Sequence, residues 1–339
     1  MAYEDRMDRA EFPFTAGVPV VFNLNPGANI LEGKVIIEAT VVVSGGTTNG
    51  VQIGDGIPNL IRRLRVLANK AAPNQNGTSR YPDGALVNCS PQTLLRYAMI
   101  ERQGKYVAEQ SGSNLGNGAA GTYNIYLSIP IFFADSLNLY TVQTALNMNP
   151  TDSQGRPVYS AVQVQVELAA TLSELFSGND RNMVVSGMVR WDDTRLGLSK
   201  DSIPLKQEDH YALIQAAYEE FVDPAMPNDG AFESWLILAQ QGVPSLALSD
   251  AIVNRLKIQG TSLNFKQNWQ AMRQQMIDDG FYDPSSTLTG QLFLDWTHGL
   301  LANSNAAAGL QHQFSVNNPS GAGLDRLRIY TRRVFGLAA

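Results

Sequence analysis

Adjacent acidic residues are the part of this sequence best suited to binding a metal ion. Asp192–Asp193 and Asp278–Asp279 are two such pairs, and Asp283 follows the second. Carboxylate oxygens are the ligands that a hard cation such as Ca²⁺ prefers, but neither pair has the spacing of an EF-hand loop. Solvated carboxylates in turns are the favoured interpretation. Asp192, Asp193, Asp278 and Asp279 stay as candidates, and we predict neither a metal site nor a cofactor.

The three histidines and the single cysteine do not form a pattern typical of an enzyme. His210, His298 and His312 have no HxH or HxxxH spacing, so the His and Glu cluster of a metal-binding cupin is missing. Cys89 has no nearby His in the sequence to activate it as a nucleophile, and one cysteine cannot form an intrachain disulfide. No GxSxG elbow or P-loop occurs. The sequence therefore predicts that the protein is not an enzyme.

One glycine-rich motif, GNGAAG at 116–121, matches the GxGxxG pattern of dinucleotide-binding proteins. Such a site needs a preceding strand and a following helix, which directs its N-terminus at the phosphates. Here the motif follows a polar loop and precedes a run typical of a strand. We interpret it as the tip of a loop.

The charge of the chain argues against direct contact with nucleic acid. The formal net charge is −6, the pI is near 5.2 and only 17% of residues are charged. Proteins that bind nucleic acid through its phosphates normally carry a basic patch or arm. Arg62, Arg63 and Arg65 lie in one strand-like run, where a solvated face or ion pairs between subunits are the favoured roles. The many neutral polar residues suit extensive contact surfaces.

The N-terminal segment MAYEDRMDRAEF is charged throughout and lacks the apolar core of a signal peptide. No stretch of the sequence approaches the roughly 18 uninterrupted apolar residues of a transmembrane helix. We expect the chain to be synthesised and folded in a cytoplasm.

The elements that carry these residues repeat, because the second half of the chain echoes runs of the first in the same order. The paired runs are LIRRLRV at 60–66 with IVNRLKI at 252–258, NIYLSI at 124–129 with QLFLDW at 291–296, and VQVQV at 162–166 with LDRLRI at 324–329. Ordered similarity of this kind is typical of two tandem domains of one fold. The alternative is that any two β-rich stretches share alternation.

β-branched and alternating patterns predict strands, separated by turn residues. The expected strands of the first half are 18–24, 34–43, 60–68, 123–129 and 161–168, with a further segment at 139–147. Long polar loops are expected at 70–88 and 104–122, and a helical turn at 171–176. Each half also contains one short amphipathic helix, at 94–102 after Ser90 and Pro91, and at 265–276.

These patterns predict an all-β fold of two tandem domains, each with about eight short strands and one inserted helix. That number of strands suits a sandwich or jelly roll of two packed sheets. The expected divisions are an N-terminal arm at 1–14, a first jelly roll at 15–178, a connector of unassigned structure at 179–206 and a second jelly roll at 207–339.

One pattern resembles a known family. A strand of the form Ile-x-Arg-Leu-basic-aliphatic follows an Asp-Gly turn at 56–66, and its counterpart follows a Ser-Asp turn at 249–258. With two tandem sandwiches and a helix in each, this resembles the double jelly-roll major capsid proteins of tailless icosahedral DNA phages, the tectivirus and corticovirus lineage. The resemblance covers about residues 12–339. It implies two tandem eight-stranded jelly rolls and a structural role in the capsid of a virion, as a homotrimer that forms a pseudo-hexagonal capsomer.

The resemblance also implies partners. In that family an N-terminal arm runs along the inner side of the capsid, and the matching residues are Tyr3, Arg6, Arg9 and Phe12. The arm mixes both signs of charge, which favours a protein contact over direct membrane binding. The implied partners are neighbouring capsomers and a vertex (penton) protein, with room for an internal membrane beneath the shell and no direct contact with nucleic acid.

Two other functions share parts of this pattern. A β-sandwich that binds carbohydrate or a receptor would have the same strands, and would be expected to carry aromatic residues on exposed loops. The long loops here hold chiefly Tyr81 and Tyr106, with Tyr97 on the nearby helix. A double-cupin enzyme would share the duplication but needs the metal cluster that is missing.

Overall fold

A computed structural model of the chain describes most of its residues. The described residues are 3–4, 10–70, 84–101, 110–111, 115–134, 144–151, 155, 157–196, 202, 204–215, 218–222, 224, 226–227, 230–243, 246–259, 264–279, 289–295, 301–302, 311–317, 319–321 and 323–335. Within this part the chain divides into two compact units, one formed by Met1–Met99 with Tyr106–Lys206 and the other by Ile100–Lys105 with Gln207–Ala339.

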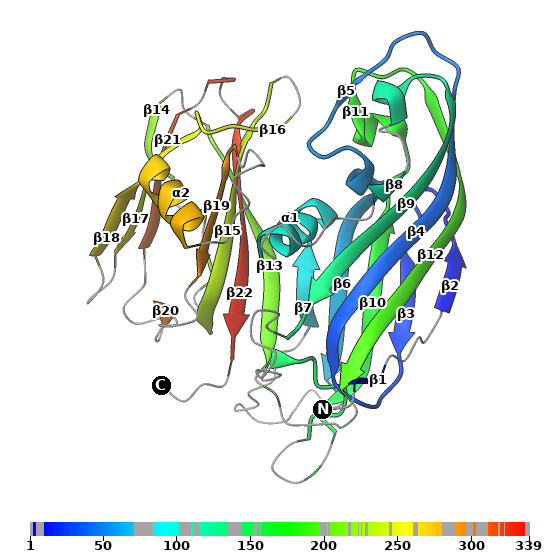
Figure 1. Ribbon diagram of the computed structural model, residues 1–339, viewed down its shortest axis with the longest axis horizontal. Helices are drawn as coiled ribbons and strands as arrows, with labels where there is room; N and C mark the ends of the chain where they lie inside the picture. Colours follow the sequence, from blue (N-terminus) through cyan, green and yellow to red (C-terminus); the bar gives the residue numbers. More distant parts are fainter. Residues whose placement is uncertain are drawn as a thin grey trace. The chain divides into compact units, whose positions relative to one another are not determined.

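Two antiparallel sheets build the first unit (Figure 1). The first sheet has the order β1-β12-β4-β9-β8, and β2 also pairs with β12. Its strands are β1 (Tyr3–Glu4), β2 (Ala10–Pro13), β4 (Ile30–Ser44), β8 (Gln110–Ser111), β9 (Gly121–Phe132) and β12 (Asn182–Leu196). β4 is its central strand, paired with β9 on one side and with β12 on the other.

The second set of strands in this unit has the order β3-β10-β6-β7. These strands are β3 (Val20–Leu24), β6 (Ile61–Lys70), β7 (Gly84–Cys89) and β10 (Tyr159–Leu168), and a small separate ladder joins β5 (Val51–Gln52) to β11 (Phe176–Ser177). Val35, Ile37 and Val41 of β4 and Leu64 and Val66 of β6 are fully buried. Along β6, buried residues thus alternate with more exposed ones, as expected for a strand with one face in the core.

Among its described residues, the first unit also contains short 3-10 helices and an α-helix. They are η1 (Ile57–Leu60), η2 (Leu115–Gly118), η4 (Leu172–Glu174) and α1 (Pro91–Glu101). The Ser90 side chain accepts a hydrogen bond of 3.2 Å from the backbone N–H of Thr93, which confirms the predicted cap of this helix. The expected helical turn at 171–176 is confirmed as η4.

The second unit also has two antiparallel sets of strands around a helix. One set contains β13 (Leu205–Leu213), β15 (Ala231–Gln241), β16 (Ala247–Leu248), β19 (Gln291–Asp295), β20 (Leu301–Ala302) and β22 (Arg326–Val334); the other contains β14 (Tyr218–Val222), β17 (Val253–Gln259), β18 (Asn264–Asn268) and β21 (Gln311–Asn317). The helix α2 (Trp269–Asp278) buries Trp269 and Met272 in the same core as Trp235, Phe314 and Ile329.

Strand order shows which elements of the two units are equivalent. The order β3-β10-β6-β7 of the first unit matches β14-β21-β17-β18 of the second, and β12-β4-β9 matches β22-β15-β19. The pairings of 60–66 with 252–258 and of 124–129 with 291–296 are therefore confirmed. The pairing of 162–166 with 324–329 is wrong, because β10 corresponds to β21 and β22 corresponds to β12. Both strands alternate apolar and polar residues, and this pattern alone cannot distinguish them.

The expected connector at 179–206 also needs correction. Residues 182–196 form β12, a strand of fifteen residues that pairs with β4 from Asn182 opposite Ser44 to Arg195 opposite Ile30. Charged residues at buried positions obscured its apolar alternation. Two smaller corrections concern the expected loop at 70–88, which contains β7, and the expected helix at 265–276, whose first residues belong to β18.

An aspartate–arginine pair ties each helix to the turn before the repeated strand. In the first unit Arg96 of α1 donates to both carboxylate oxygens of Asp55. In the second unit Arg273 of α2 donates to Asp250, which also accepts from the indole Nε1 of Trp269 at 3.0 Å and from the backbone N–H of Gly290 at 2.9 Å. The Asp-Gly and Ser-Asp turns that stand out in the sequence therefore position the helices.

We predict that Asp250→Ala lowers the free energy of unfolding by about 2 to 4 kcal/mol. The change removes a half-buried carboxylate that accepts hydrogen bonds from three donors. Denaturant unfolding followed by tryptophan fluorescence measures the effect. Asp278→Ala is the matched control, since Asp278 is exposed and accepts from Gln274 on its own helix; its effect should stay within about 0.5 kcal/mol. Equal effects of the two changes would contradict the assigned role of Asp250.

Candidate assembly surfaces

The N-terminal segment lies along one edge of β12. In β1, Tyr3 is opposite Leu196 and Glu4 is opposite Arg195, while in β2 the residues Ala10–Pro13 lie opposite 188–191. Figure 1 shows β2 beside the middle of β12. Of the four expected arm residues, Tyr3 and Phe12 are thus placed against this strand, and Arg6 and Arg9 lie outside the described residues.

Phe12 also contacts the other sheet of its own unit. Its ring meets that of the buried Phe22 of β3 edge-on, with centroids 5.2 Å apart. Next to it, Glu11 lies 3.8 Å from Arg190 of β12, which also approaches Glu38 and Asp192. The segment 10–13 is therefore anchored within its own unit by a ring contact, strand pairing and charge.

Asp193 belongs to a buried cluster on the inner face of β12. Both of its oxygens accept from Arg195, at 2.9 and 3.0 Å, and one accepts from the indole Nε1 of Trp191 at 3.1 Å. The side chains of Arg195 and Asp193 are 1% and 0% exposed, and Arg195 also donates to the backbone carbonyl of Asn25. Because both of its oxygens already accept from these donors, Asp193 forms a structural ion pair with Arg195.

The other three candidates for cation binding belong to two separate elements, Asp192 to β12 and the neighbouring Asp278 and Asp279 to the end of α2. Asp192 forms an ion pair of 3.2 Å with Arg190, and Asp278 and Asp279 are exposed at the end of α2. Among the residues that the structure describes, no group of three or more His, Cys, Asp or Glu side chains is arranged to hold a metal ion.

The arginines of β6 interact with neighbouring strands. Arg65 forms an ion pair of 2.8 Å with Glu167 of β10 and also reaches Gln165, and Arg63 donates to the Asn88 side chain of β7. These residues form a hydrogen-bonded ladder across the outer face of the sheet. It combines charged residues with amides, which agrees with the predicted solvated strand face.

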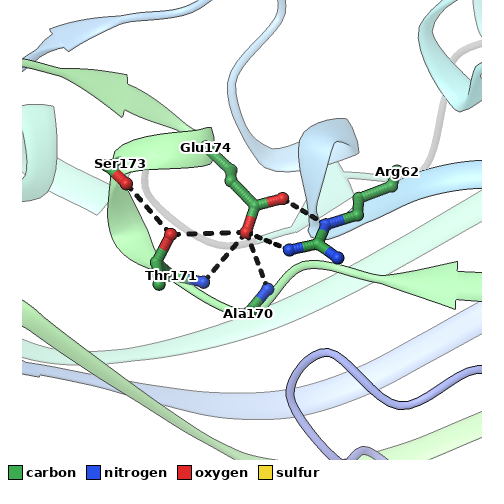
Figure 2. Close-up of polar contacts among 5 residues, drawn as sticks. All are labelled: Arg62, Ala170, Thr171, Ser173 and Glu174. Carbon is green, nitrogen blue, oxygen red and sulfur yellow. Dashed lines mark hydrogen bonds and ion pairs between the residues drawn. The ribbon is translucent and has the colours of Figure 1, made fainter.

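Arg62 faces a different partner, the carboxylate of Glu174 in η4. Figure 2 shows the Arg62 guanidinium, the Thr171 side chain and the backbone nitrogens of Ala170 and Thr171 directed at this carboxylate. Arg62 Nη2 lies 2.7 Å from Glu174 Oε1, and the backbone nitrogens lie 2.9 and 3.1 Å from the same oxygen. The contact joins the start of β6 to the turn that follows β10.

These donors change the ionisation of Glu174. Burial alone raises the pKa of a carboxyl group, but the hydrogen bonds from Arg62, Ala170 and Thr171 outweigh it and lower the pKa of Glu174 from 4.5 to about 2. The same contact raises the pKa of Arg62.

The described residues among the remaining candidates, which are the cysteine, two histidines and the glycine-rich motif, have structural roles. Cys89 is buried in β7, and His312 packs edge-on against Trp235 with ring centroids 4.9 Å apart. His210 lies 3.2 Å from the hydroxyl of Thr331, while His298 is outside the described residues. The motif at 116–121 spans η2 and the first residue of β9, a strand, so the helix that a dinucleotide site requires does not follow it.

Sequence reasoning also missed a polar contact just before the first residue of β12. The Asp180 carboxylate accepts from the backbone N–H groups of Thr47 and Thr48, which lowers its pKa, and Arg181 donates to the carbonyl of Gly45 at 2.9 Å. Together they hold the turn after β4. The signal in the sequence is the Gly-Asn-Asp-Arg run at 178–181, whose residue types are typical of a turn.

A carbohydrate-binding sandwich would be expected to expose aromatic residues near its long loops. Tyr97, the aromatic residue nearest the long loops, is only 4% exposed, and Tyr81 and Tyr106 lie outside the described residues. No helix in the described part of the chain has the length and apolar character needed to span a membrane.

Comparison with solved structures identifies the fold. The structure matches the STIV MCP with a TM-score of 0.69 at 10% identity, covering 99% of this chain and 97% of that one. It also matches a chain from Sulfolobus Turreted Icosahedral Virus (TM-score 0.67, 11% identity, 99% and 91% covered) and the major capsid protein P2 from Bacteriophage PM2 (TM-score 0.55, 10% identity, 97% and 98% covered). No family model and no curated protein matches the sequence.

These matches extend over both units of the chain. The expected all-β architecture of two tandem jelly rolls, each with a short helix, is thereby confirmed. The chain has the double jelly-roll fold.

We predict that Asp193→Asn lowers the free energy of unfolding by about 3 to 5 kcal/mol, because it leaves the buried Arg195 charge without its carboxylate. Asp192→Asn is the neighbouring control, and its half-exposed ion pair with Arg190 contributes about 1 kcal/mol or less. Denaturant unfolding of both variants measures the difference. A calcium-dependent rise in Tm that Asp193→Asn abolishes would instead support a cation at this position.

We also predict that Glu174 contributes to stability at neutral pH and that this contribution is lost in acid. Its folded pKa of about 2 lies below the ordinary 4.5, so its contribution is present above pH 4.5 and disappears as the pH falls from about 4.5 to about 2. Unfolding measured across this range should show a smaller acid-induced loss in Glu174→Gln than in the unchanged chain. Identical losses would show that the Arg62 contact does not stabilise the ionised carboxylate.

Proposed function

We propose that this chain is a structural major capsid protein that forms the shell of an icosahedral virion. The observation that carries the proposal is the whole-chain match to viral proteins, including one described as a major capsid protein, because it covers both jelly rolls rather than one domain. Its role is structural rather than enzymatic. Its location is the virion, after synthesis in the cytoplasm of a host.

The proposed working unit is a homotrimer, whose six jelly rolls give a pseudo-hexagonal capsomer. Closed symmetric assemblies are the usual form of soluble oligomers, and a shell built from many modest contacts can correct errors as it forms. Low charge supports this proposal, since only 17% of residues are charged.

The proposed partners are neighbouring capsomers, which the N-terminal arm contacts, and a vertex protein. Residues 10–13 anchor the base of the arm in its own unit, whereas β1 pairs through only two residues. Of the expected arm residues, we therefore assign Arg6 and Arg9 to the neighbouring capsomer, because Tyr3 pairs with Leu196 of its own chain. An internal membrane is compatible with this arrangement, and no direct contact with nucleic acid is expected from a chain of charge −6.

The oligomeric state tests the proposal. Light scattering of the purified chain should give a mass of about three times 36.9 kDa that does not change with concentration. A clean monomer at every concentration would contradict the trimer, and binding to a glycan array would then favour a carbohydrate-binding β-sandwich.

Deletion of residues 2–9 should leave the trimer intact and abolish its assembly into shells, because it removes the arm beyond the anchor at 10–13. Light scattering measures the trimer, and electron microscopy measures the shells. Arg6→Gln with Arg9→Gln keeps the length of the arm and isolates its positive charges. Normal shells from the deletion variant would refute the assignment of the arm to neighbouring capsomers.

A further inference from the structure

One end of β12 offers an open edge. β4 pairs with β12 along its whole length, but the opposite side of β12 is paired only in its second half, by β2 and β1. The last contact on this side is the hydrogen bond of 2.9 Å from the Phe14 N–H to the Gly187 carbonyl. Among the described residues, none pairs with 182–186 on that side, and Figure 1 shows β2 ending well short of the upper end of β12.

Exposed apolar side chains lie on the outer face beside this edge. Val184 is 57% exposed, and Met188 of the same strand and Val42 of β4 are each 38% exposed. Val184 lies directly opposite Val42, which in turn lies opposite Thr122 of β9. We call the edge 182–186 together with Val42, Val184 and Met188 the β12 patch.

The β12 patch lacks the features that usually protect an edge strand. Unpaired N–H and C=O groups of an edge attract another strand, and proteins block this with Lys, Pro, a bulge or a covering loop. The edge sequence Asn-Met-Val-Val-Ser contains no charge and no proline, and it pairs with β4 without a register shift. The outer residues Thr40, Ser186 and Asn124 around it are also neutral, while the exposed Glu38 opposite Met188 is paired with Arg190 at 3.5 Å.

We propose that the β12 patch is a contact between two copies of this chain, made when they assemble. This inference rests on the proposed function and specifies one of its surfaces. Each copy carries a net charge of −6, so a contact through uncharged surface lets two copies meet without bringing further like charges together. A partner recognised by charge would need charged residues in the patch, and the edge and its apolar residues have none.

The size of the patch also fits a contact within a larger assembly. Two strands about 4.8 Å apart, over about seven residues that each rise about 3.3 Å, give its face an area on the order of 200 Å². A stable isolated pair of proteins buries about 800 Å² on each partner. The β12 patch alone therefore does not hold two copies together, and it forms as one of several contacts in a trimer or shell.

Charged substitutions test the contact. Val184→Glu and Val42→Glu should lower the fraction of chain in the largest assembly at least tenfold, measured by light scattering and electron microscopy at equal concentration. Val21→Glu is the matched control for Val42→Glu, because Val21 is a strand valine of β3 with 37% exposure outside the patch. Circular dichroism and Tm check that each variant is folded. Normal assembly of a folded Val184→Glu would overturn the inference and exclude the patch as a contact between copies.

Hydrogen exchange on the unchanged chain gives a second test that needs no substitution. Backbone amides within 182–186 should exchange at least tenfold more slowly in the assembled form than in the dispersed chain. Equal rates in an intact assembly would overturn the inference while leaving the proposed function standing. An unchanged chain that stays monomeric would refute both, so the two failures are distinguishable.

Discussion

The antiparallel ladder between β4 and β12 is the contact on which the first unit depends. Its register runs from Asn182 opposite Ser44 to Arg195 opposite Ile30. Within it, the indole of Trp191 lies against Gly33 so closely that a Cβ at Gly33 would be 2.0 Å from the ring. A glycine is needed there for steric reasons, since any side chain would displace the tryptophan. This packing holds the end of β12 at which Asp193 and Arg195 form their buried pair.

The same strand links the stability of the unit to its surfaces. Its inner face carries the Trp191–Asp193–Arg195 cluster, one edge holds β1 and β2, and its upper end presents Val184 to solvent. The outer face of β6 and β10 has the opposite character, because Arg63 and Arg65 are satisfied by Asn88 and Glu167 within the unit. A neutral face with an open edge is better suited to a protein contact than a face whose polar groups already have partners.

The fold could be predicted largely because strand alternation and turns were regular where one face is buried. The runs at 60–66 and 252–258 identified β6 and β17, and Ser90 with Pro91 identified the start of α1. β12 was missed because Asp193 and Arg195 occupy buried positions, where an apolar residue is normally expected. That omission displaced the end of the first copy, so VQVQV was matched to β22 instead of β21. Local patterns identify strands, but only pairing distinguishes one alternating strand from another.

The surfaces were less predictable than the fold. The arm residues came from a resemblance, and the structure adds that Phe12 packs against Phe22 in its own unit. The exposure of Val42 and Val184 depends on which strands lie beside them, which composition does not reveal. In the sequence, Asp55 and Asp250 could be recognised only as turn residues. Their partners Arg96 and Arg273 lie 41 and 23 residues away, too far for a local pattern to connect them.

The central claim is that this double jelly roll builds a capsid, and cryo-electron microscopy of the purified oligomer tests it most directly. The account predicts a three-fold particle in which three chains present six jelly-roll densities in a pseudo-hexagonal ring. A single chain, or an oligomer whose symmetry is not three-fold, would contradict it.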